Sequence, residues 1–284
     1  KQTFEKIHGL EERICRMEKV IVGGLFAIFL ALLSNHMWLY DSMRIIRQDE
    51  SFIVTDFKWE KKYPYEEYTR NDGHGPRTYN VGEKKVPSVT TILSATQSAK
   101  KKQSLEDWRQ RVGYAEAQKI TQQAATRGTE MHYVLEQYIN GIGYLNLSED
   151  GATARLMAHH IIQNLRDLKI IYGSEVSLAY EDRWAGSTDL VGVYRDKPTI
   201  IDFKQSNKPK REEWIEDYYY QIAAYSLAHQ KQYGPIEQGL IAMCTPNLVA
   251  QTFFMSKEML LEYQEKWLER VETYHKNRSE KPQN

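Results

Sequence analysis

The sequence predicts an α/β domain in which a mixed β-sheet is flanked by helices. Two observations carry this prediction. Between residues 174 and 206, apolar and polar residues alternate over three short stretches, SEVSLAY, RWAGSTDLVGVY and PTIIDFKQS, and this period is typical of strands. On either side of these stretches, apolar residues instead recur every three or four positions, which is typical of helices that pack one face against a core.

The individual elements follow from the same patterns, in order along the chain. Glycine and proline in RNDGHGPRTYNVGEKKVPSVT predict a loop followed by a hairpin. Helical patterns then cover 104–139, with Ser104 as the N-cap and Gly113 and Gly128 as interruptions, and 150–173. After the three strands we expect a helix over about 212–233, a closing hairpin over 237–256 and a last helix over about 257–276.

The first 42 residues differ from the rest. Residues 20–40 contain no Asp, Glu, Lys or Arg, and an apolar helix of this length is about what a bilayer requires. They predict an N-terminal hydrophobic helix with a membrane span at 20–40, the alternative being a helix buried in an oligomer. Residues 43–284 are predicted to form the second domain, with a helical and hairpin insertion at 76–125 and a core at 126–278.

Composition excludes several classes of protein. The chain has 38 basic and 38 acidic residues, so only local basic patches such as SAKKKQ and NKPKREE can attract a polyanion, and each patch alone also fits ordinary solvated surface. Two cysteines without a CxxC spacing argue against zinc fingers and disulfide scaffolds. The sequence has no GxGxxG, Walker, HExxH or GxSxG motif, which disfavours the enzyme classes that use them.

Two acids face each other across the predicted central hairpin. If the hairpin closes at Arg195 and Asp196, residues whose numbers sum to 391 lie opposite each other, which pairs Asp189 with Asp202. Opposed carboxylates repel, and a divalent cation such as Mg²⁺ between them removes the repulsion. Lys204 lies on the same strand face as Asp202, where its ammonium can hold an attacking water or neutralise a phosphate oxygen. The alternative is a surface ion pair between Asp202 and Lys204.

Further candidate ligands come from neighbouring elements. Glu175, at the predicted start of the preceding strand, can add a third carboxylate to the same cluster. In RGTEMHYVLE, Gly128, His132 and Glu136 recur every fourth residue and therefore lie on one helical face, where a neutral imidazole can bind a metal. A packed or surface histidine is the alternative.

Taken in order, these residues resemble the PD-(D/E)XK nuclease core, in which an acid on one strand is followed by acid-x-Lys on the next. RGTEMH and YQIAAY resemble its RecB-type exonuclease branch. That resemblance implies a restriction-endonuclease-like fold and a Mg²⁺- or Mn²⁺-dependent exonuclease acting on single-stranded DNA with a free end. The chain departs from the pattern at Thr188, where the motif has proline, and at Gln205, where many relatives have threonine.

The resemblance also implies roles for individual residues. Lys204 would position the water, with Asp189, Asp202 and Glu175 as its catalytic partners. The residues implied to bind the metal are His132, Asp189, Asp202 and Phe203. Those implied to contact DNA are Gln221, Tyr225, Arg127, Ser88, Thr90, Lys208 and Lys210.

Two other functions stay open. The chain can be a non-catalytic nucleic-acid clamp tethered to a membrane through 20–40, or a membrane-anchored scaffold. We expect a cytoplasmic or nucleoid-associated protein of bacterial or viral source, membrane-tethered if the span is real, with the mitochondrial matrix as the alternative.

Overall fold

The computed structural model describes residues 57–73, 75–141 and 149–279, all within one of two units of the chain, Thr55–Asn284. The predicted hydrophobic helix at 20–40 lies outside these residues. None of the described helices is long and apolar enough to cross a membrane.

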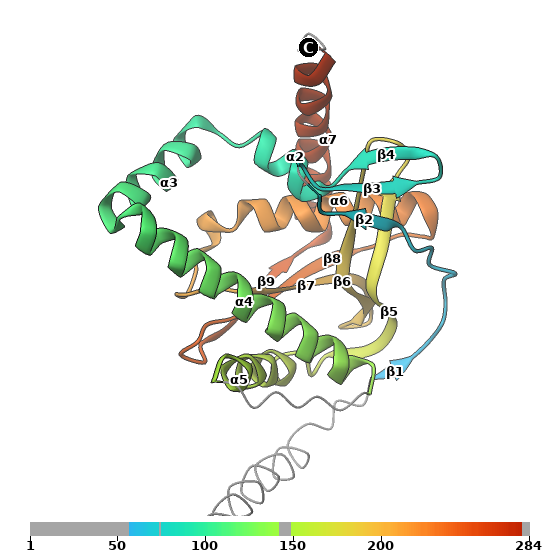
Figure 1. The fold of residues 1–284 in the computed structure, drawn as a ribbon. Coiled ribbons are helices and arrows are strands. Elements are labelled where there is room, and N and C mark those ends of the chain that lie inside the picture. Colours follow the sequence, from blue (N-terminus) through green and yellow to red (C-terminus); the bar gives the residue numbers. More distant parts are fainter. Residues whose placement is uncertain (1–56, 74, 142–148, 280–284) are drawn as a thin grey trace, which may run out of the picture. The chain divides into compact units, whose positions relative to one another are not determined.

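The core is a six-stranded mixed sheet with the order β1-β5-β6-β7-β8-β9 (Figure 1). Strand β1 is parallel to β5, β7 is parallel to β8, and the remaining neighbours are antiparallel. The prediction of a mixed sheet flanked by helices is therefore confirmed. The strands are β1 (Lys58–Trp59), β5 (Leu168–Tyr180), β6 (Trp184–Tyr194), β7 (Lys197–Gln205), β8 (Gln238–Cys244) and β9 (Ala250–Met255).

Helices cover both faces of this sheet. Helices α4 and α5 pack together and contact β7, β8 and β9, whereas α6 packs on the other face against β5 to β8 and is covered by α7. Helix α3 projects away from the sheet, and none of its residues is buried (Figure 1). The helices are α2 (Val89–Ala95), α3 (Ala99–Val112), α4 (Tyr114–Ile139), α5 (Glu149–Gln163), α6 (Glu216–Gln232) and α7 (Lys257–Ser279), with a 3₁₀ turn at Glu212–Trp214.

A second, three-stranded sheet lies beside the strand β6. It consists of β2 (Thr69–Asn71), β3 (Thr78–Val81) and β4 (Lys84–Pro87), all antiparallel. A small apolar cluster joins Tyr79 and Val86 of this sheet to Ala179 and Ala185 of the large one. The small sheet and the helix α2 that follows it are therefore fixed against the turn end of the β5–β6 hairpin.

The predicted register of the central hairpin is confirmed. Five pairs, from Leu190↔Ile201 to Tyr194↔Lys197, have numbers that sum to the expected value. Arg195 and Asp196 both have positive φ, 48° and 63°, as a two-residue hairpin turn between right-twisted strands requires.

Three boundaries differ from the prediction. Helix α5 ends at Gln163, and 168–173 belong to β5, because a short apolar run such as LKIIY fits either period. Ser104 lies inside α3, whose N-cap is Ser98, since the polar run AKKKQ has no apolar periodicity to reveal a helix start. Gly113 does separate two helices, but α4 continues through Gly128.

Candidate metal centre

The sheet is irregular where its acidic residues meet. Ser174 pairs with Leu190 and Val176 with Thr188, but Glu175 and Asp189 between them form no ladder pair. Glu175 has a φ of 51°, in the left-handed region that a residue other than glycine seldom adopts. The prediction that Glu175 begins a strand is wrong, because β5 starts at Leu168 and Glu175 lies inside it. Backbone strain of this kind is concentrated at functional sites.

The Asp189 carboxylate enters the gap at the end of the β6–β7 ladder. Its Oδ2 accepts a hydrogen bond from the backbone N–H of Phe203, with an N···O distance of 2.5 Å. The last backbone pair is Leu190↔Ile201, so the ladder ends one position before the expected Asp189–Asp202 pair, and the Asp189 side chain bonds to the residue after Asp202 instead. The second oxygen, Oδ1, lies 3.1 Å from Nδ1 of His132 on α4.

Three residues from three elements converge at this point. One ligand atom each from His132, Glu175 and Asp189 lies within 4.8 Å of the others. Ser187 holds the Glu175 carboxylate through a 3.4 Å hydrogen bond from its hydroxyl. One imidazole nitrogen and two carboxylate oxygens are donors that suit a divalent metal ion. The group is a candidate metal site.

Asp202 lies beside this group but is directed toward Lys204. The two side chains form an ion pair, and both are largely buried, with relative exposures of 5% and 18%. Apart from this pair, Asp202 Oδ2 accepts no hydrogen bond from the described residues. The Lys204 ammonium also lies 5.2 Å from the centre of the Tyr218 ring, a cation–π contact that orients it.

The charges of the site shift one another's pKa values. Burial would raise the pKa of Asp189, but the adjacent His132 lowers it. Burial raises the pKa of Asp202, although Lys204 opposes this. Burial would lower the pKa of Lys204, and Asp202 and Asp189 raise it. Burial would also lower the pKa of His132, and Asp189 raises it.

Burial and acidic neighbours also act on Glu175. Partial burial and the Asp189 charge raise its pKa to about 7. Because its side chain is still exposed to solvent, screening moderates this shift. Negative charge is therefore unfavourable here until a cation is present.

Phe203 contributes structure to the site. Its ring meets His132 edge-on, with a centroid distance of 6.4 Å and an interplanar angle of 70°. Together with the bond from its N–H to Asp189, this contact connects α4 to β7 and β6.

The candidate DNA-contacting residues occupy different depths. Tyr225 of α6 is only 5% exposed, and its ring lies over Gly186 of β6. Gln221, one turn earlier, has a buried Oε1 that accepts no hydrogen bond from the described residues. Arg127 of α4 donates from Nε to Gln205 at 2.9 Å and also contacts Asn207. It therefore lines the end of β7.

The remaining candidates lie in two places, at the start of α2 and in the segment after β7. Ser88 is buried and caps α2 by accepting a hydrogen bond from Thr91 N at 3.0 Å, whereas Thr90 is exposed beside it. Lys208 is exposed after β7, and Lys210 is held there by backbone bonds to Gln251. The sequence analysis missed Tyr218 as the partner of Lys204, because three consecutive tyrosines precede Gln221 and helical periodicity does not distinguish them.

Comparison with known proteins identifies relatives. No protein-family model matches the sequence. Mitochondrial genome maintenance exonuclease 1 of Xenopus tropicalis is 30% identical over 223 residues, which is 72% of this chain and 62% of the relative. The chain is homologous to this exonuclease. The human exonuclease of the same name is 27% identical over 201 residues, or 66% of this chain and 58% of the relative.

These exonuclease relatives are longer than the region they share with this chain. The chain spans about six-tenths of their length. A solved structure described as a putative exonuclease from Eubacterium rectale is 12% identical, covers 53% of this chain and 68% of that chain, and has a TM-score of 0.38, too low for a conclusion about this chain.

Proposed function

We propose that this chain is a metal-dependent exonuclease with a restriction-endonuclease-like PD-(D/E)XK core. It would hydrolyse phosphodiester bonds in single-stranded DNA from a free end. The observation that carries the proposal is the convergence of His132, Glu175 and Asp189 beside the buried Asp202–Lys204 pair. Homology to an exonuclease supports the same reaction class.

The donor set fits a metal ion. His132, Glu175 and Asp189 would hold Mg²⁺ or Mn²⁺, and the Asp202 carboxylate, whose Oδ2 is paired with Lys204, would join them. When bound, such an ion supplies positive charge to a phosphate oxygen and favours hydroxide at neutral pH. Phe203 is proposed to support this group rather than supply a side-chain ligand, because its ring has no donor atom.

Side chains of the protein would position the attacking water and orient the metal ligands. Lys204 is held by Asp202 and by the Tyr218 ring, so its ammonium stays in one place at low entropic cost. We expect it to hold the attacking water and to neutralise charge that builds up on the phosphate. The bond from Phe203 N–H to Asp189 keeps that carboxylate oriented toward His132.

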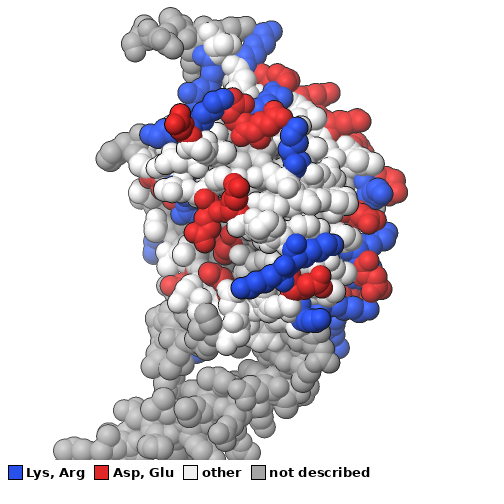
Figure 2. Space-filling model, turned by 90° about the vertical axis from the view of Figure 1, so that its right-hand side faces the viewer, with Lys and Arg blue, Asp and Glu red and all other residues white. Residues whose placement is uncertain are grey.

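Binding of the strand would involve polar groups around the site. Gln221 would contact a nucleotide, because its amide oxygen, buried in this structure, has no hydrogen-bond donor among the described residues, and Arg127, Lys208 and Lys210 lie at or just after the end of β7. Tyr225 is too buried to stack on a base and would act by holding Gly186 and β6 in place. Acidic and basic side chains are mixed on the face that Figure 2 shows, and no broad basic surface covers that face. A mitochondrial location, as in the names of the relatives, and a bacterial or viral one both stay predictions.

Degradation of end-labelled DNA tests the proposal. The full chain should degrade linear single-stranded DNA with Mg²⁺ or Mn²⁺, leave circular DNA intact and be inactive in EDTA. Labels at the 5′ and 3′ ends report the direction. Cleavage of circles would overturn the exonuclease assignment, and binding without cleavage under every condition would favour the non-catalytic clamp.

A further inference from the structure

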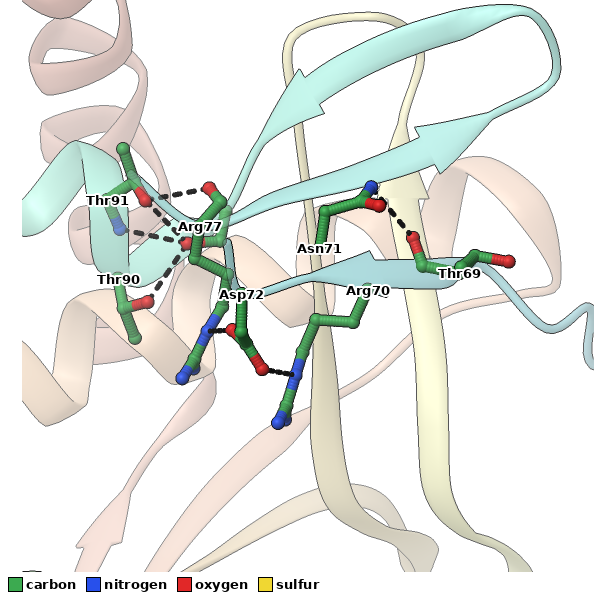
Figure 3. A network of polar contacts seen from close by, with 8 residues as sticks. Thr69, Arg70, Asn71, Asp72, Arg77, Thr90 and Thr91 are labelled. Carbon is green, nitrogen blue, oxygen red and sulfur yellow. Dashed lines mark hydrogen bonds and ion pairs between the residues drawn. The ribbon is translucent and has the colours of Figure 1, made fainter. Parts of the chain in front are cut away.

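Two arginines share one aspartate on the small sheet beside β6 (Figure 3). Arg70 Nε donates to Asp72 Oδ2 and Arg77 Nε donates to Asp72 Oδ1, both at 2.6 Å. Each guanidinium thus uses only its inner nitrogen. The terminal nitrogens of both arginines make no hydrogen bond within the described part of the chain, and in Figure 3 both groups extend to the same side.

The arrangement carries excess positive charge in a fixed orientation. Two guanidinium groups and one carboxylate leave a net charge of +1, and the hydrogen bond from Arg77 lowers the pKa of Asp72, so this carboxylate stays ionised. The hairpin that carries the arginines is fixed by Asn71, which donates to Asn80 at 3.0 Å. The side chains of Arg70 and Arg77 remain about half exposed, at 53% and 42%.

Contacts with α2 and β6 tie this cluster to the metal centre. Thr91 Oγ1 donates to the Arg77 carbonyl at 2.8 Å and accepts from Ser88 Oγ at 2.9 Å. Ser88 in turn forms a bridge to Ala185. Ala185 lies four positions before Asp189 on β6, so the arginines are positioned by the same strand as the metal centre.

Tyr225 lies near both groups. Its ring packs against Gly186, which follows Ala185 on β6. Burial raises the pKa of Tyr225 most, the charges of Asp202 and Asp189 raise it further, and the charge of Arg77 lowers it. The small sheet that carries the arginines and the acids of the metal centre thus meet the same strand.

We propose that Arg70 and Arg77 form a clamp for a phosphate group of the nucleic-acid strand that occupies the metal centre. This inference rests on the proposed function. Each free guanidinium edge offers two parallel N–H donors, which match two oxygens of a phosphate. Asp72 holds both side chains in position before binding, so less side-chain entropy is lost when the phosphate arrives. The alternative is an ordinary surface ion cluster, which would contribute little to binding or stability.

The test measures binding of a fluorescent single-stranded oligonucleotide by anisotropy, in EDTA, at several salt concentrations. Arg70→Ala and Arg77→Ala should each weaken binding about tenfold and lower the slope of log Kd against log salt by about 0.7. Arg77→Lys keeps the charge but loses the paired donors, so its affinity should lie between wild type and alanine. Arg195→Ala is the matched control, because Arg195 is an exposed arginine that pairs with Asp167 at the far end of β6. This variant should bind the oligonucleotide with wild-type affinity.

Two outcomes separate the clamp from the proposed function. If the wild type binds and degrades DNA while Arg70→Ala and Arg77→Ala bind with unchanged affinity and salt slope, the clamp is wrong and the nuclease stands. If the wild type neither binds nor cuts, both proposals fall. Strands with a 5′-phosphate, a 3′-phosphate or neither identify which phosphate is bound: an equal loss on all three indicates an internal phosphodiester, and a loss confined to one indicates that terminal phosphate.

Discussion

The Asp189 carboxylate accepts a hydrogen bond from the backbone N–H of Phe203, where the β6–β7 ladder ends. This contact lets the strands part without leaving the N–H of Phe203 unpaired, which would be costly in the interior. It also directs the other oxygen of Asp189 toward His132. The metal centre thus depends on a break in the sheet.

Replacing Asp189 tests this dual role. Asp189→Asn keeps the shape and an acceptor for Phe203 but removes the charge beside His132 and Glu175. We expect Mn²⁺ affinity to fall by more than about tenfold and hydrolysis by about a hundredfold or more, with little change in the melting temperature. Calorimetric titration and a cleavage assay measure both. Unchanged Mn²⁺ affinity would exclude Asp189 as a ligand.

Metal binding should stabilise the folded protein, because a cation relieves repulsion between the two acids. A ligand at a hundred times its Kd adds about 2.7 kcal/mol to the free energy of unfolding, enough to raise the melting temperature by a few degrees. Glu175→Gln should raise the melting temperature of the metal-free protein and shrink the rise on adding Mn²⁺. A wild-type melting temperature that does not respond to Mg²⁺ or Mn²⁺ would argue against the site.

Gly186 should not tolerate a side chain. A Cβ there would lie 2.7 Å from Cε1 of the buried Tyr225 ring. We expect Gly186→Ala to lower the free energy of unfolding by about 1–3 kcal/mol. Gly128→Ala is the control, because its Cβ would meet only the Gln205 side chain at 3.7 Å and alanine favours a helix, so its stability should be equal or higher. Equal stability of both variants in urea unfolding would contradict the packing described for Tyr225.

His229 should make stability fall at acidic pH. Its Nδ1 lies 2.7 Å from the Gly234 carbonyl and therefore carries the proton, while Nε2 accepts from the Tyr65 hydroxyl at 3.0 Å. Burial lowers the pKa of His229, so below its usual value of about 6.5 the unfolded chain takes up a proton first and the folded state loses stability.

His229→Gln removes this titration. The variant should be less stable than wild type at pH 7.5, and the difference should narrow as the pH falls to 5.5. Urea unfolding at the two pH values measures the difference. A difference that stays constant would show that His229 does not titrate on unfolding.

The sequence predicted the parts of the site that depend on local geometry. The turn at Arg195 and Asp196 and the two-residue period sufficed to place Asp189 near Asp202, and helical spacing placed His132 on one face with Gly128. The interruption of the β5–β6 ladder at Glu175 was not predictable. The surrounding sheet imposes a left-handed backbone there, and the position has no glycine that would have indicated one.

Tertiary contacts were also beyond sequence reasoning. No periodicity encodes the docking of the small sheet against β5 and β6. Asp72 is shared by Arg70 and Arg77 within one hairpin, but side-chain pairing of this kind leaves no signal in the sequence pattern. The extent of β5 was missed because its first residues are a short apolar run that suits a helix equally well.

The central claim is that Asp202 and Lys204 act with a metal ion on a phosphodiester. The most direct measurement is the single-turnover rate of nucleotide release from linear single-stranded DNA with Mg²⁺, for wild type, Asp202→Asn, Lys204→Ala and Lys169→Ala. Lys169 pairs with Asp196 on the surface and serves as the control. We predict wild-type rates for Lys169→Ala, rates reduced by at least about a hundredfold for the other two, and none in EDTA. Wild-type rates for Lys204→Ala or Asp202→Asn, or hydrolysis that persists in EDTA, would contradict the account.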